Sequence, residues 1–179
     1  MKIYMFLAEG FEEVEALAPL DLLRRAGLDI KTVGIGGKLI TGAHGIKIEA
    51  DLTEAEATET VDAVILPGGM PGTLNLDASK TVCDLTLDTY ARGGYVCAIC
   101  AAPRVLGRLG ILDGRSFTCY PGTEELVPNG NFIGSRVCVD GKIVTARGMG
   151  CAVNFGLALV GMFCDEETEK KLRAATISD

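Results

Sequence analysis

Histidine is scarce in this chain, and tryptophan is absent. Among the 179 residues the only histidine is His44. The sequence also lacks a second CxxC motif, so the ligand spacing of common structural zinc sites is missing and we expect no bound metal. A catalytic cysteine–histidine pair would depend on His44 alone.

Positive charge and long apolar runs are limited as well. The 17 lysines and arginines are outnumbered by 24 aspartates and glutamates, which gives a net charge of −7 without any basic run. This balance argues against nucleic acid or an anionic membrane as a partner. No apolar run reaches the roughly 18 residues that a membrane span requires. The apolar start of the chain is too short for a signal peptide.

The cysteine count points to a reducing compartment. There are seven cysteines, an odd number, and no secretion signal. This combination argues against a disulfide framework and predicts a cytoplasmic location. Cys97 and Cys100 form a CxxC, but Cys97 lies within an apolar run, where the exposed first cysteine of a dithiol exchange motif is not expected.

Predicted strands and helices alternate along the chain. Strands are expected at 2–8, 29–35, 62–66, 95–99 and 116–120. Segments 38–41 and 46–50 are expected as a small hairpin or a pair of edge strands, and segments 136–139 and 142–146 as a hairpin. Helices are expected at 11–26, 53–58, 79–92, from 101 onward, 152–164 and 166–175, with Pro19 kinking or restarting the first. The pattern predicts one α/β domain over residues 1–179, with a mostly parallel sheet covered on both faces.

Cys100 lies where a strand is expected to give way to a helix. The apolar run Tyr95–Ile99 is typical of a buried strand, and Pro103 suits the first turn of the helix that follows. Amides at such a junction, Ala101 N–H among them, favour an anion, so they should favour the reactive thiolate. The alternative is a buried, inert cysteine.

Two further segments are expected at the carboxyl ends of strands, where ligands bind in such sheets. Glu15 shares one helical line with Phe11, Ala18 and Leu22, so its carboxyl group lies in an apolar stripe, whereas the two glutamates at 12 and 13 can face water. Burial should raise the pKa of Glu15, and the protonated group could donate a hydrogen bond to the Cys100 thiolate. A boundary position with a solvated carboxylate is the alternative.

The second segment is Pro67-Gly68-Gly69. Glycines allow a ligand to approach the backbone closely, so the Gly69 amide could be a second donor to a negatively charged substrate oxygen. A plain turn is the alternative. The segment is not a phosphate-binding Walker loop, because no Gly-Lys-Ser/Thr follows.

Four motifs together resemble the ThiJ/PfpI superfamily, and most of all its branch of the Parkinsonism-associated deglycase and its bacterial homologues. They are AEGFEEVEA at 8–16, LPGG at 66–69, AICAAP at 98–103 and TARGMG at 145–150. The resemblance implies a flavodoxin-like three-layer sandwich and a homodimer, with the arginine motif at 24–27 on the dimer side. It also implies that Cys100 is the nucleophile and oxidation-sensitive cysteine, that Glu15 is its protonated partner, and that Gly68, Gly69 and Ala101 face the substrate.

The chain departs from the family pattern at three places. Tyr120 stands where some members carry a histidine, and Tyr120 and Arg147 are additional candidate site residues. The usual GPG after the last strand is GMG at 148–150. Cys100 is followed by Ala101 instead of the histidine of the protease branch, which argues against peptidase activity.

The sequence therefore carries two functional hypotheses. The first is a cysteine-dependent enzyme without a cofactor that acts on reactive dicarbonyls or on glycated substrates, as a glutathione-independent glyoxalase or deglycase. The second is a non-enzymatic sensor of oxidative stress, or a redox-regulated chaperone, in which Cys100 is oxidised to a sulfinate.

Overall fold

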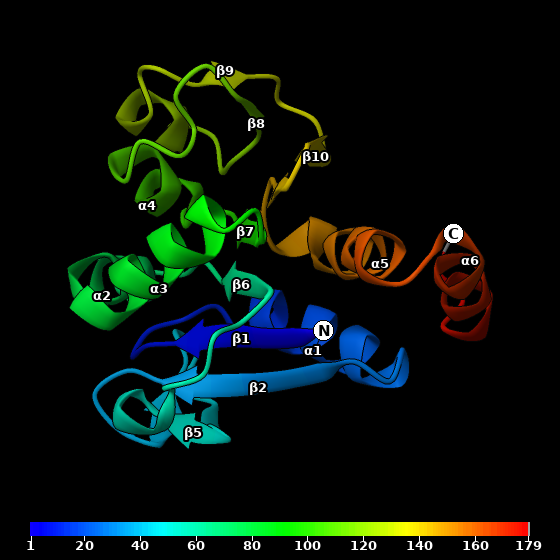
Figure 1. The fold of residues 1–179 in the computed structure, drawn as a ribbon, viewed down its shortest axis with the longest axis horizontal. Helices are drawn as coiled ribbons and strands as arrows, with labels where there is room; N and C mark the ends of the chain where they lie inside the picture. Colours follow the sequence, from blue (N-terminus) through cyan, green and yellow to red (C-terminus); the bar gives the residue numbers. More distant parts are fainter. Residues whose placement is uncertain (179) are drawn as a thin grey trace.

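A computed structural model describes residues 1–178 and shows a central sheet between two layers of helices (Figure 1). The strands of this sheet are β1 (Lys2–Leu7), β2 (Asp29–Gly34), β5 (Leu52–Thr53), β6 (Ala63–Leu66), β7 (Tyr95–Ile99), β10 (Val137–Asp140) and β11 (Ile143–Ala146). Their order is β10-β11-β7-β6-β1-β2-β5, and all neighbouring pairs are parallel except β10 with β11. The mostly parallel α/β sheet expected from the sequence is confirmed.

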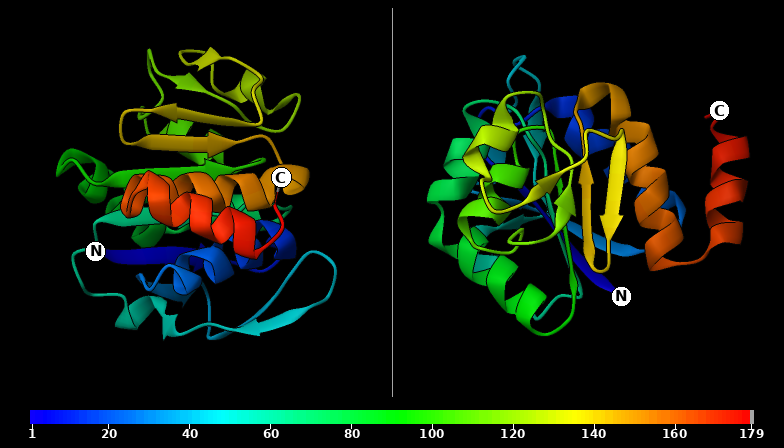
Figure 2. Two further views of the ribbon diagram at one scale, coloured as in Figure 1. Left: turned by 90° about the vertical axis from the view of Figure 1, so that its right-hand side faces the viewer. Right: turned by 90° about the horizontal axis from the view of Figure 1, so that it is seen from above.

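Both faces of the sheet are covered by helices, as Figure 2 shows in its view from above. One face carries α1 (Glu13–Arg25) and α5 (Ala152–Phe163), with α6 (Glu166–Ala175) packed on the outer side of α5. The other carries α2 (Gly72–Ala78), α3 (Lys80–Ala91) and α4 (Pro103–Arg108). The side chains of Ile3, Met5 and Leu7 pack with the first group, and those of Tyr4 and Phe6 with the second. Strands buried on both faces are apolar throughout, which is why β6 and β7 read as unbroken apolar runs.

Two small sheets lie outside the central one. β3 (Leu39–Thr41) and β4 (Lys47–Glu49) form the expected antiparallel hairpin. The predicted strand at 116–120 is only β8 (Ser116–Phe117), which pairs with β9 (Asn131–Phe132) and not with the central sheet. The hairpin at β10 and β11 forms as expected around its Asp-Gly turn.

Several local expectations are wrong. The segment at 53–58 is not a helix: β5 pairs with β2, and one 3-10 turn, Glu54–Glu56, follows it. Helix α2 was not expected at all. Helix α1 begins at Glu13 and continues through Pro19 as a single helix. Pro19 is accommodated against α5, where Gly156 has no side chain and a Cβ would lie 2.8 Å from the Pro19 Cα.

The strand order reverses at β1, because β2 lies on one side of it and β6 on the other. Parallel strands end at the same edge, so the segments after β1, β6 and β7 meet there. Among residues 1–178, no helix combines the length and the apolar surface that crossing a bilayer would take.

Candidate active site

Cys100 directly follows β7 and adopts a left-handed backbone conformation, with φ at 64°. This conformation costs a non-glycine residue about 1–2 kcal/mol. The surrounding backbone maintains it, because Cys100 N–H donates to Ala146 O (2.9 Å) and Cys100 O accepts from Tyr120 N–H (2.8 Å). Helix α4 starts only at Pro103, so a short turn, and not the helix end expected from the sequence, follows the cysteine.

Two backbone amides hydrogen-bond to the sulfur of Cys100, those of Ala101 and Gly69. Gly69 follows β6, and its φ of 92° lies in the region that favours glycine. A Cβ at this position would also lie 2.6 Å from Gly10 O. The loop after β6 is therefore more than a turn, since its close approach to the chain after β1 brings an amide to the sulfur.

Glu15 lies in the first turns of α1, and only 1% of its surface is exposed. Its carboxyl group accepts a hydrogen bond from Gly68 N–H at 3.0 Å and is hydrogen-bonded with the Cys100 thiol. A Cβ at Gly68 would lie 2.5 Å from Glu15 Oε2 and 2.7 Å from Cys100 Cβ. Glycine at 68 thus leaves the space in which the carboxyl and thiol groups meet.

Burial determines how these two groups ionise. Burial raises the pKa of Glu15 to about 7, with the nearby charge of Glu12 adding to the shift. Burial, followed by the charge and hydrogen bond of Glu15, raises the pKa of Cys100 to about 12. The amides of Ala101 and Gly69 lower this pKa, but burial outweighs them, so the expected net preference for the thiolate is wrong. The pKa of Glu15 therefore lies near neutral pH and that of the Cys100 thiol lies well above it.

The other cysteine and the additional candidates take different positions. Cys97 is fully buried within β7, and burial raises its pKa, so it does not present an exposed dithiol with Cys100. Tyr120 is bonded to Cys100 through its backbone, and its exposed ring lies beside Gly148. The guanidinium of Arg147 donates to Gly134 O at 3.3 Å.

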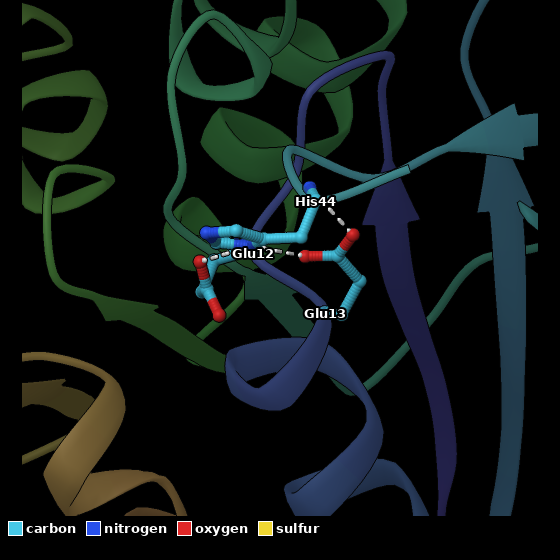
Figure 3. Close-up of side chains that lie close together, drawn as sticks. All are labelled: Glu12, Glu13 and His44. Carbon is cyan, nitrogen blue, oxygen red and sulfur yellow. Dashed lines mark hydrogen bonds and ion pairs between the residues drawn. The ribbon is translucent and has the colours of Figure 1, made fainter. Parts of the chain in front are cut away.

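A polar cluster next to this site was not foreseen (Figure 3). Glu13, expected to face water, is only 3% exposed. Its Oε1 accepts hydrogen bonds from His44 N–H (2.8 Å) and Ile46 N–H (3.3 Å). Its Oε2 lies 2.9 Å from His44 Nδ1, and Glu12 Oε2 lies 3.4 Å from the same nitrogen. The helical pattern could not show this burial, because the hairpin of β3 and β4 covers Glu13 from about thirty residues away in the sequence.

The fold and site define an α/β sandwich with a cysteine in a left-handed turn after a central strand, beside a buried carboxyl group. Residues 1–162 match the DJ-1/PfpI family, and the chain belongs to this family. The dj-1beta protein of Drosophila melanogaster is 36% identical over 167 residues, covering 91% of this chain and 89% of that protein. A deglycase of Pyrococcus horikoshii is 33% identical over 151 residues, covering 82% and 90%.

Solved structures give the same result. A DJ-1 superfamily protein of Salmonella typhimurium superposes with a TM-score of 0.95 at 32% identity, covering 99% of this chain and 98% of that one. Oxidized DJ-1 of Toxoplasma gondii also has a TM-score of 0.95 at 32% identity, covering 98% and 97%. The flavodoxin-like fold that the resemblance implied is thereby confirmed.

Proposed function

We propose that this chain is a cofactor-free enzyme that acts on reactive dicarbonyls or glycated substrates, with Cys100 as its nucleophile. One observation carries the proposal: the buried carboxyl group of Glu15 is hydrogen-bonded with the Cys100 thiol, and burial raises the pKa of Glu15 to about 7. A group that exchanges protons near pH 7 beside a nucleophile suits general acid–base catalysis. A relative in the family is named a deglycase, which agrees with this assignment.

The first step is addition of the sulfur to an aldehyde. Glu15 accepts the thiol proton as the sulfur of Cys100 bonds to the aldehyde carbon, and the carbonyl oxygen becomes negatively charged. The amides of Ala101 and Gly69, already directed at the sulfur, stabilise this neighbouring oxygen as hydrogen-bond donors. Protonation of the oxygen gives a hemithioacetal and returns Glu15 to its carboxylate form.

The second step is an internal oxidation and reduction. With methylglyoxal as substrate, Glu15 removes the proton from the former aldehyde carbon and delivers it to the adjacent carbon. The hydroxyl proton on the first carbon passes to the oxygen of the second, so the first carbon becomes a thioester, the second becomes an alcohol, and no outside electron acceptor is needed. Water then hydrolyses the thioester to lactate and restores the Cys100 thiol.

The decisive experiment is to measure lactate formed from methylglyoxal by the purified chain without glutathione. Cys100→Ser should abolish turnover, while Cys164→Ser, a change of an exposed cysteine outside the site, should leave it unchanged. No lactate above the uncatalysed rate from the wild type, or full activity in Cys100→Ser, would contradict the proposal.

A sensor role is the second candidate, because Cys100 is half-buried and so remains accessible to peroxide. Protonated Glu15 could donate a hydrogen bond to a Cys100 sulfinate and stabilise it. Mass spectrometry after limited peroxide treatment measures the sulfinate. The sensor role is favoured if the wild type gives no lactate but accumulates a stable sulfinate at Cys100.

We also propose that the chain forms a homodimer and is located in a reducing cytoplasm. Support for the dimer comes from apolar side chains exposed at the first turns of α1 and α5, Val14 and Val153. Support for the location comes from the odd number of cysteines, all of which are free.

A further inference from the structure

We propose that Glu12, Glu13 and His44 bind a divalent transition-metal ion, for which Zn²⁺ is the best-suited probe. Imidazole nitrogen and carboxylate oxygen are both ligands that Zn²⁺ accepts, and three protein ligands leave a fourth position for water. The site is distinct from the Cys100 pair, and the inference does not depend on the proposed function.

The hairpin of β3 and β4 positions the histidine. Gly10 N–H donates to Thr41 O (2.8 Å), and Ala43 N–H donates to Phe11 O (2.8 Å), so the chain leading from β3 to His44 is bonded to the segment before α1. At Gly42 a side chain would collide with that of Glu13. Backbone contacts therefore fix His44 over the start of α1.

The three candidate ligand atoms lie close enough together to surround one ion, although His44 and Glu13 are at hydrogen-bonding distance without it. The Nδ1 of His44 lies 2.9 Å from Glu13 Oε2 and 3.4 Å from Glu12 Oε2, and the three ligand atoms all lie within 4.8 Å of one another. Ligands about 2.0–2.2 Å from a tetrahedral zinc ion are roughly 3.3–3.5 Å apart. Small rotations of two side chains would make room for the ion.

The environment of Glu13 orients one oxygen toward this position. Its Oε1 is occupied by the amides of His44 and Ile46, at 2.8 and 3.3 Å, which leaves Oε2 directed at the histidine. Hydrogen bonds of this kind to a ligating carboxylate orient it and support metal affinity. The imidazole of His44 is exposed, with 69% of its side chain accessible, so an ion and its water have an open path from solvent.

The net negative charge of the three side chains favours binding of a divalent cation. Two carboxylates face one imidazole, and no ion pair within residues 1–178 brings a lysine or arginine to either glutamate. A protonated His44 would still leave a charge of −1. A divalent ion bound to the neutral imidazole would balance both carboxylates, one of which is almost completely buried.

The single histidine makes the test direct, because one set of imidazole NMR signals belongs to His44. We expect equimolar Zn²⁺ at neutral pH to shift these signals and calorimetry to give one ion per chain. His44→Asn and Glu12→Gln should each weaken binding at least about tenfold. Glu49→Gln, a change of an exposed carboxylate on β4, is the matched control and should bind like the wild type.

The experiment must distinguish an ion bound by cysteine thiols from one bound by Glu12, Glu13 and His44. Co²⁺ in the wild type should give a spectrum without thiolate charge-transfer bands, and Cys100→Ser should retain the ion. Unmoved His44 signals, wild-type affinity in His44→Asn, equal weakening in Glu49→Gln, or loss of binding in Cys100→Ser would each overturn the site. If Glu13→Gln disturbs the fold, the variants at His44 and Glu12 still test the site, because spectra of the metal-free variants report whether they are folded.

Discussion

At the scale of single residues, the Glu15–Cys100 pair depends on one exchangeable proton. Glu15→Gln keeps the size of the side chain and its ability to donate a hydrogen bond, but it cannot exchange protons. We expect this variant to stay folded and to lose dicarbonyl turnover by two to four powers of ten, roughly the usual contribution of a general acid–base group. Steady-state kinetics with methylglyoxal, alongside a thermal melt, measure both. Turnover equal to the wild type would exclude Glu15 as the proton carrier.

The buried carboxyl of Glu15 also predicts a pH dependence of stability. Its pKa is raised from 4.5 to about 7 in the folded chain, so the folded state binds more protons than the unfolded state between these values. Stability from this group is complete below pH 4.5 and is lost as pH rises through 7, by about 2–4 kcal/mol. Urea unfolding at several pH values should show the difference between wild type and Glu15→Gln changing over this window. A difference independent of pH would contradict the assignment.

His44 should titrate above its ordinary range in the metal-free chain. The hydrogen bond that His44 donates to the Glu13 carboxylate, together with the charges of Glu12 and Glu13, raises the pKa of His44 above 6.5. NMR titration of the imidazole measures the midpoint, which should fall toward 6.5 in Glu13→Gln. A midpoint unaffected by this substitution would mean that the two side chains are not paired in solution.

At the scale of elements, the loop after β6 depends on the absence of a side chain at Gly68. The Cβ of Gly68→Ala would lie 2.5 Å from Glu15 Oε2 and 2.7 Å from Cys100 Cβ. Overpacking of this kind costs about 1–3 kcal/mol, and it should also abolish turnover by separating the pair. Gly37→Ala is the matched control, because a Cβ there meets nothing within 4 Å. Denaturant unfolding and kinetics on both variants check the prediction.

Elements with a strong local signal could be predicted from the sequence. The strand Tyr95–Ile99 ends where its apolar run ends, and the Asp-Gly turn identifies the hairpin of β10 and β11. The segment at 116–120 could not be predicted in the same way. Its side chains suit a strand, but partners distant in the sequence decide which sheet it joins.

The part of the candidate site that depends on helical spacing could be predicted from the sequence. The part that depends on contact with the hairpin of β3 and β4 could not. Glu15 lies on the apolar line of α1, so its burial followed from spacing alone. The burial of Glu13 comes from the loop containing His44, and no local pattern reports such a contact. The upward shift in the pKa of Cys100 likewise depends on how deeply the folded chain buries the sulfur.

At the scale of the whole molecule, the layer of α1 and α5 exposes apolar side chains close to the candidate site. The first turns of α1 and α5 lie at the same edge of the sheet, since both helices follow parallel strands, and Val14 and Val153 are exposed there. We expect a dimer of twice the 18.8 kDa chain mass in sedimentation at micromolar concentration. Val153→Asp should shift the equilibrium toward monomer, and Leu87→Asp on the opposite layer should not. A wild type that sediments only as monomer would refute the interface.

The bond from Cys100 N–H to Ala146 O has a consequence for synthesis of the protein. During synthesis Cys100 is added to the chain before Ala146. Until Ala146 has been made, the nascent chain lacks the hydrogen-bond acceptor that holds Cys100 in its left-handed turn. During that interval the thiol is in water and titrates like a free cysteine, at about pH 8.5. The newly made chain thus carries a more easily ionised thiol than the finished protein, and is open to electrophiles until its last parallel strand has joined the sheet.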